Sequence, residues 1–122
     1  MSGLRFDFVN KLITRHAIAP QSIAGTTVLG AAIDCNDLAG DVGLYVEAGA
    51  VATSVDAKLQ ESDVSGSGFA DCAIPCAIVQ ITTANKTQMV RGLRTKRYLR
   101  VSTTTVGTAL VAASVLGFSK AQ

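Results

Sequence analysis

Apolar and polar residues alternate along much of this chain, and a period of two is typical of β-strands that are buried on one side. Residues 55–60 alternate in this way, with Val, Ala and Leu on one side and Asp, Lys and Gln on the other. Val42, Leu44 and Val46 repeat the pattern and are separated by Gly and Tyr. A Ser/Gly-rich stretch at residues 64–68 predicts a turn between strands.

The remaining strand-like segments are short and are separated by turn-forming residues, which predicts an all-β fold. We expect an antiparallel β-sandwich or jelly roll with an N-terminal arm. The alternation places Leu44, Val46, Leu59, Leu99 and Val101 in the core. Further strands are predicted at residues 26–35, 69–72, 76–82, 88–93, 96–104 and 108–118.

The start of the chain differs from the rest, and we interpret residues 1–20 as an N-terminal arm and residues 21–122 as one β-domain. Phe6 and Phe8, half of the four Phe residues of the chain, lie in this arm. Its pattern fits either a short helix or an extended segment, and Pro20 ends it. We expect the arm to contact a partner or a neighbouring subunit.

The composition adds that the surface is poor in charge. Of the 122 residues, 48% are hydrophobic and 16% are charged, whereas about 25% are charged in a typical soluble domain. A small domain with so few charges suits a protein that lies against a partner. The sequence contains neither a run of about 18 apolar residues nor a secretory signal pattern, so we expect no membrane partner and synthesis in a cytoplasm.

Residues that could carry catalysis or bind a metal do not form a recognisable site, so we expect neither an enzyme nor a cofactor. Cys35, Cys72 and Cys76 are an odd number, and the spacing of the last two is not that of a zinc knuckle, so we expect free thiols. His16 is the only histidine. The acidic loop at residues 34–41 lacks EF-hand ligands at the fifth and twelfth positions, which favours a solvated turn over a calcium site.

Positive charge is concentrated in one segment, and the rest of the chain is net negative. If residues 94–101 form one strand, Arg94, Lys96, Tyr98 and Arg100 share its outer face. Such a face fits an acidic protein or a phosphate backbone, or is merely solvated. It holds one aromatic residue, whereas single-strand binders offer several stacking rings, which disfavours nucleic acid as the partner. The basic residues are Arg91, Arg94, Lys96, Arg97 and Arg100.

Three segments, taken in order, resemble the small capsid decoration proteins, or cement proteins, of tailed bacteriophages. The similarity covers roughly residues 26 to 118. The segments are VGLYVEAGA at 42–50; KLQESD at 58–63 with the turn that leads to GFAD at 68–71; and KRYLRV at 96–101, followed by TTT at 103–105 and an apolar stretch at 110–116.

The resemblance implies a structural virion protein, made in the host cytoplasm, that lies on the outer surface of the assembled capsid. It implies that the chain binds the major capsid protein and clamps adjacent subunits, as a dimer or trimer and without catalysis. Two other functions stay open: a nucleic-acid-binding β-module that uses residues 91–100, and a carbohydrate-binding sandwich on the phage surface. The residues that we expect to contact the capsid or a neighbouring subunit are Phe6, Phe8, Arg91, Arg94, Lys96, Tyr98 and Arg100.

Overall fold

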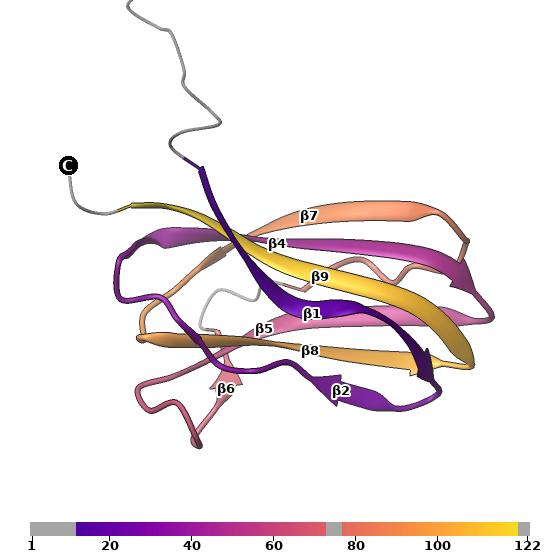
Figure 1. Ribbon diagram of the computed structural model, residues 1–122, viewed down its shortest axis with the longest axis horizontal. Helices are drawn as coiled ribbons and strands as arrows, with labels where there is room; N and C mark the ends of the chain where they lie inside the picture. Colours follow the sequence, from indigo (N-terminus) through magenta and orange to yellow (C-terminus); the bar gives the residue numbers. More distant parts are fainter. Residues whose placement is uncertain (1–11, 73–76, 120–122) are drawn as a thin grey trace, which may run out of the picture.

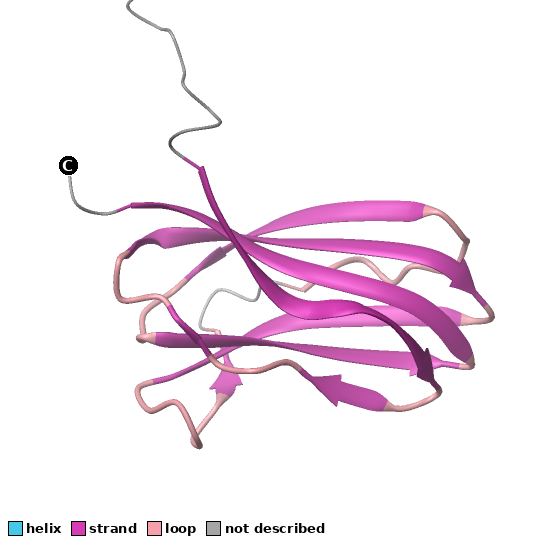
Figure 2. Cartoon of the chain, viewed as in Figure 1, coloured by secondary structure: helices cyan, strands magenta, loops and turns pink. Residues whose placement is uncertain are grey.

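The computed structural model describes residues 12–72 and 77–119, and every regular element within them is a β-strand (Figure 1, Figure 2). The prediction of an all-β chain is therefore confirmed. The strands of this part of the chain are β1 Leu12–Ala24, β2 Thr27–Leu29, β3 Ile33–Asp34, β4 Leu38–Val51, β5 Ser54–Ser62, β6 Ala70–Asp71, β7 Lys86–Leu93, β8 Tyr98–Val106 and β9 Thr108–Ser119.

The strands form two antiparallel sheets, which occupy the upper and lower halves of Figure 1. Sheet A has the order β1-β9-β4-β7, and sheet B has the order β2-β8-β5-β6, with β3 also paired to β8. Because β2 and β3 both pair with β8, they share one strand position, and each sheet has four positions. Two facing sheets with this strand order form a jelly roll, one of the two predicted architectures.

The core lies between the sheets and is built from the alternating residues of the sequence pattern. In sheet A, β4 and β9 bury alternate residues, and β5 and β8 supply the opposite side from sheet B. Small aliphatic side chains fill this space, since the chain has no Trp. The five predicted core residues, Leu44, Val46, Leu59, Leu99 and Val101, are each less than 2% exposed, which confirms the prediction.

The N-terminal part of the described chain is a strand of the domain, which differs from the expectation of an arm up to residue 20. β1 pairs with β9 from Leu12 onward, so residues 12–20 belong to sheet A and are not helical. The ladder shifts register on both sides of Ile18, and these shifts obscure the period of two in the sequence. Pro20 lies at one shift, on an edge strand, where a residue without an N–H is tolerated.

Two predicted strands are interrupted. Residues 26–35 form the short strands β2 and β3, and Gly30 lies between them. The backbone passes so close to β1 there that a Cβ on Gly30 would lie 2.3 Å from the carbonyl oxygen of Ala17. The described part of the segment predicted at 76–82 makes isolated bridges to β5 instead of a continuous strand.

Candidate protein-interaction face

The outward side of sheet A carries large apolar side chains, although the inward side of the same strands already forms the core. In β9, Val111 and Val115 are buried inward, while Leu110 and Phe118, on the other side, are 48% and 38% exposed. Met89 of β7 is 61% exposed. Exposed apolar side chains grouped on one face indicate a surface that contacts another molecule. We call this surface the outer face; it includes Leu12, Gly43, Tyr45, Met89, Leu110, Leu116 and Phe118.

The register of sheet A brings the outer face together from four strands. Gly43 of β4 lies opposite Leu116 of β9 on one side and opposite Arg91 of β7 on the other. Two residues along, Tyr45 lies opposite Met89. At the end of the sheet, the first residue of β1 pairs with the last but one of β9. Segments far apart in the sequence therefore form one continuous surface.

The outer face is hollowed where Gly43 lies between larger neighbours. The hollow has a volume of about 380 Å³, and its walls include Leu12, Met89, Leu116 and Phe118. A neighbouring depression of about 420 Å³ shares three of these four walls and continues across β1. A Cβ built on Gly43 would lie 3.7 Å from the Cβ of Leu116 and 3.9 Å from the Cγ of Met89. The space is therefore open because residue 43 has no side chain.

Polar groups surround the apolar part of the outer face. Arg91, at the rim of the hollow, forms an ion pair with Asp41 at 2.7 Å. A further hollow of about 380 Å³ lies at the opposite end of the face, where Glu47, Gly49 and Leu110 are among its walls. An apolar centre with a charged rim is the usual anatomy of a protein–protein interface.

The outer face of sheet B, in contrast, is mostly polar, and its polar side chains bond to one another, although Leu29 of the edge strand β2 and Val106 at the end of β8 are exposed. The Nε of Arg100 donates to Gln60 at 2.8 Å, and the guanidinium carbon lies 4.5 Å from the ring centre of Phe69. Gln60 and Lys58 both donate to Asp71 at 3.2 Å. These two hydrogen bonds, the one from Gln60 foremost, lower the pKa of Asp71. The polar groups of this face are thus largely satisfied within the chain.

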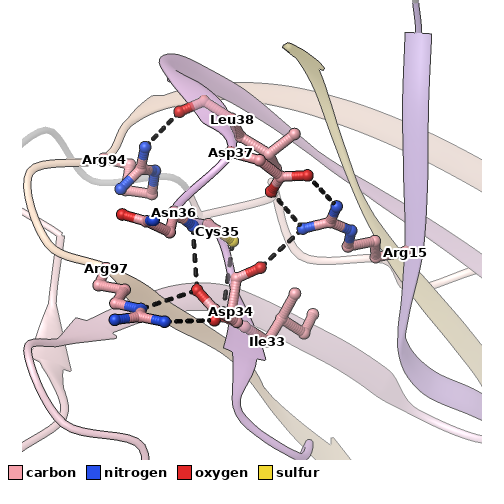
Figure 3. Close-up of polar contacts among 9 residues, drawn as sticks. All are labelled: Arg15, Ile33, Asp34, Cys35, Asn36, Asp37, Leu38, Arg94 and Arg97. Carbon is pink, nitrogen blue, oxygen red and sulfur yellow. Dashed lines mark hydrogen bonds and ion pairs between the residues drawn. The ribbon is translucent and has the colours of Figure 1, made fainter. Parts of the chain in front are cut away.

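Three arginines from different parts of the chain hold the acidic loop between β3 and β4 (Figure 3). Arg97 donates twice to the carboxylate of Asp34, at 3.0 and 2.8 Å. Arg15 of β1 donates twice to Asp37, at 3.0 and 2.7 Å, and once to the carbonyl oxygen of Asp34, at 2.6 Å. Arg94 donates to the first carbonyl oxygen of β4. Forked pairs of this kind give the loop a fixed geometry.

These ion pairs change the titration of the loop. Hydrogen bonds from Arg97 and from a backbone N–H lower the pKa of Asp34 to about 2. The hydrogen bonds from Arg15 lower the pKa of Asp37. Burial raises the pKa of the Cys35 thiol, because it disfavours the thiolate. The arginines hold this turn in place, and the carboxylates of Asp34 and Asp37 both accept hydrogen bonds from them.

The predicted basic stripe does not form one face of a strand. β8 begins at Tyr98, two residues after the start of the strand predicted at 96–104, and residues 94–97 form the loop before it, so the condition that residues 94–101 form one strand is not met. The loop takes this path because its backbone bonds to other parts of the chain: the N–H of Arg94 donates to the carbonyl oxygen of Gly40 at 2.6 Å. Local alternation cannot anticipate such long-range bonds.

The seven residues predicted to contact a partner are separated in the structure. Arg91 lies at the rim of the hollow on sheet A, and the residues of the former stripe lie on sheet B or in the loop that precedes it. Lys96 lies 4.0 Å from Asp63. Phe6 and Phe8 lie outside the described residues. Of the five such residues within the described part of the chain, only Arg91 lies at the outer face.

Glu61 is a buried carboxylate that the sequence analysis did not single out. It is 4% exposed, although the alternation of β5, which puts residue 61 on the same side as Leu59, gives a signal for this. Its carboxylate accepts the N–H and hydroxyl of Thr95, both at 2.8 Å, and the N–H of Lys96 at 3.3 Å. With three donors it is fully engaged, and it anchors the loop before β8.

The outer face was also missed, although β9 carries a signal for it. Residues 108–118 are apolar at both inward and outward positions, a pattern expected of strands that are covered on both sides. In a fold of two layers, the outward side has no third layer to cover it. An apolar outward side on a surface strand is typical of a site that contacts another molecule.

The only histidine of the chain and two of its three cysteines lie within the described residues. Within residues 12–72 and 77–119, no group of three or more His, Cys, Asp or Glu side chains is placed to hold a metal ion. The same residues include no helix of the length and hydropathy that a membrane span requires. Cys35 is a free, buried thiol, Cys72 is buried as well, and Cys76 lies outside the described residues.

This chain is similar to known proteins in its fold. The sequence matches no family model and no curated protein. The PBSX exported protein XepA is similar in structure, with a TM-score of 0.64 and 12% identity over 90% of this chain and 38% of XepA. The SPBc2 prophage-derived protein YomS has a TM-score of 0.52 and 12% identity over 87% of this chain and 93% of YomS.

A chain from the structure of infectious bursal disease virus Gx strain is similar as well. Its TM-score is 0.54 and its identity 12%, over 87% of this chain and 31% of the viral chain. The chain therefore spans less than two fifths of XepA and of the viral chain, and nearly all of YomS. At this level of identity the similarity shows a shared fold: the chain has an all-β sandwich fold that also occurs in proteins of prophage and viral origin.

Proposed function

We propose that this chain is a structural virion protein that binds the assembled capsid of a tailed phage on its outer surface and holds adjacent major capsid protein subunits together. The outer face of sheet A carries the proposal, because it presents a large apolar surface on a domain whose charged side chains bond mostly to one another. The fold shared with proteins of prophage and viral origin supports it. The sequence resemblance to phage decoration proteins supports it as well.

The mechanism is differential binding and needs no catalytic step. A protein that binds the assembled lattice, but not free subunits, stabilises the lattice by mass action. Burial of the apolar outer face supplies most of the affinity, and charged groups at its rim, such as Arg91 and Asp41, orient the encounter. Because a capsid repeats the same site many times, a modest gain at each site sums to a large total.

The alternative of nucleic-acid binding has weaker support. A phosphate-binding surface needs basic side chains that are free to reach phosphates. Arg15, Arg94 and Arg97 instead hold the loop between β3 and β4, and Arg100 bonds to Gln60. A carbohydrate site would rely on stacking aromatic side chains, and the chain has no Trp.

Co-sedimentation tests the proposal. The full chain is mixed with empty capsids of the phage that encodes it, and bound protein is measured against free concentration. We expect saturable binding that Leu110→Asp weakens at least about tenfold, because it places a charge in an apolar contact. Val106→Asp is the matched control, since Val106 is a similarly exposed apolar residue (55%) in β8 of the other sheet.

The outcomes separate the candidate functions. Saturable binding that is lost with Leu110→Asp and kept with Val106→Asp supports capsid docking through the outer face. Equal losses in the two variants would argue against the outer face. Absence of capsid binding, together with retention on DNA that falls steeply with salt, would replace the proposal by the nucleic-acid alternative.

A further inference from the structure

The hollow around Gly43 is the most sharply defined feature of the outer face. It measures about 380 Å³, within the range of small ligand sites, and its walls are mostly apolar. Leu12 and Phe118 close it at the end of the sheet, and Met89 and Leu116 form its sides. A hollow with this lining fits an aromatic or large aliphatic side chain better than a charged group.

The part of the chain before Leu12 supplies side chains of this kind. Residues 1–11 contain Phe6 and Phe8, and Leu4 and Val9 lie next to this pair in the sequence. The segment ends at Leu12, which is itself a wall of the hollow. Eleven residues span at most about 36–40 Å, which is more than the roughly 15 Å across four paired strands. The segment is thus long enough to extend beyond the sheet of its own copy.

We propose that the hollow around Gly43 binds the N-terminal segment, residues 1–11, of a neighbouring copy of this chain, with Phe6 or Phe8 inserted between Met89 and Leu116. A neighbouring copy is favoured over the same chain by the direction of β1. Leu12 pairs with Phe118 at the end of sheet A, and both residues line the hollow, so β1 begins at the hollow and runs away from it. A return of Phe8 to its own hollow would require the chain to reverse within the three residues that separate Phe8 from Leu12.

Exchange of N-terminal segments links copies of the chain to each other. If two copies exchange segments reciprocally, the assembly closes as a two-fold dimer, and a cyclic exchange closes a larger ring. The opposite end of the outer face, around Leu110, stays available for the capsid. The inference rests on the proposed function only in treating the outer face as an interaction surface, because self-association is measured without capsids.

Two full-length variants test the exchange by sedimentation velocity. Gly43→Leu fills the hollow, while Gly43→Ala is the matched control, because a Cβ at this position makes only ordinary contacts. Phe6→Ser with Phe8→Ser removes the inserted side chains and leaves the hollow intact. We expect the parent chain and Gly43→Ala to self-associate, and we expect Gly43→Leu and the double Ser variant to associate at least about tenfold more weakly.

A mixture of the two weakened variants gives the decisive result. One variant keeps the segment and the other keeps the hollow, so exchange between copies predicts that the mixture regains a heterodimer held by one contact. Thermal unfolding checks that each variant is folded. If Gly43→Leu does not fold, Met89→Asp replaces it, with Leu29→Asp on an exposed site of sheet B as its control.

Three results would overturn the inference. The parent chain could be monomeric at all concentrations. The variants could associate as well as the parent, which would place the interface elsewhere. The mixture could fail to regain association, which would assign the segment to its own chain. Capsid co-sedimentation of the double Ser variant separates the two proposals: retained binding with a loss of association supports both, and lost binding with normal association contradicts the exchange alone.

Discussion

The outer faces of the two sheets lie over one core but use their side chains in opposite ways. On sheet B, Arg100, Gln60 and Asp71 form a network of hydrogen bonds along the surface. On sheet A, Met89 and Leu110 are exposed. On sheet B the polar groups are satisfied within the chain, and the exposed apolar residues Leu29 and Val106 lie in the edge strand β2 and at the end of β8; on sheet A, Met89 and Leu110 line hollows.

The difference shows that charge concentrated in one segment of the sequence can be engaged largely within the chain itself. The basic residues between 91 and 100 are the most conspicuous charge feature, yet Arg94 and Arg97 brace a loop of the same chain. The apolar surface that we propose for docking is formed instead by uncharged residues of β4, β7 and β9.

The largest effect is expected in the core that both faces share. Leu44 lies beneath the outer face of sheet A and Leu99 beneath that of sheet B, and both are fully buried. Leu44→Ala and Leu99→Ala should each lower the free energy of unfolding by about 2–5 kcal/mol. Chemical denaturation measures both. A change below about 0.5 kcal/mol in either variant would show that the two faces do not lie over one core.

The second effect concerns the loop at the end of sheet B. Glu61→Ala leaves the N–H groups of Thr95 and Lys96 without their acceptor and should cost about 1–3 kcal/mol in the free energy of unfolding. Glu61→Gln keeps one carbonyl acceptor and should cost less. Urea titrations of the two variants give the comparison. Equal losses in both would mean that the charge of Glu61, rather than its role as an acceptor, matters.

The third effect is a fall in the free energy of unfolding at low pH. The pKa of Asp34 is lowered from 3.8 to about 2 in the folded chain, so this group stabilises the fold above pH 4. That contribution is lost as the pH falls from about 4 to about 2, because protonation breaks the pair with Arg97. Urea midpoints measured across this window should fall less steeply in Asp34→Asn and in Arg97→Met. A profile identical to that of the parent chain would remove the pair from the stability of the loop.

The smallest effect on stability is expected at the two surfaces themselves. Arg100→Met on sheet B and Leu110→Asp on sheet A should each change the free energy of unfolding by about 1 kcal/mol or less. Only Leu110→Asp should weaken association with capsids. Parallel unfolding and co-sedimentation measurements test this. If Arg100→Met also lost association with capsids, the outer face of sheet B would contact the capsid as well, and the two faces would not differ in function.

The alternation of the sequence was sufficient to predict the fold class and the core. A strand exposes successive side chains on opposite sides, so a period of two reports burial from local sequence alone. This is why Leu44, Leu59 and Leu99 were identified as core residues. The same reasoning failed for residues 12–20, where register shifts break the period, and for residues 94–97, where the chain forms a loop.

Only the tertiary structure shows which surface residues from distant segments lie next to one another. Arg15 meets Asp37, and Gly43 lies between Leu116 and Arg91, because strand order and register bring distant segments together. These pairings depend on contacts between residues far apart in the chain, which local periodicity does not encode. Local alternation therefore predicts the central core residues of this jelly roll, whereas the arrangement of its strands determines which exposed residues lie side by side on one face.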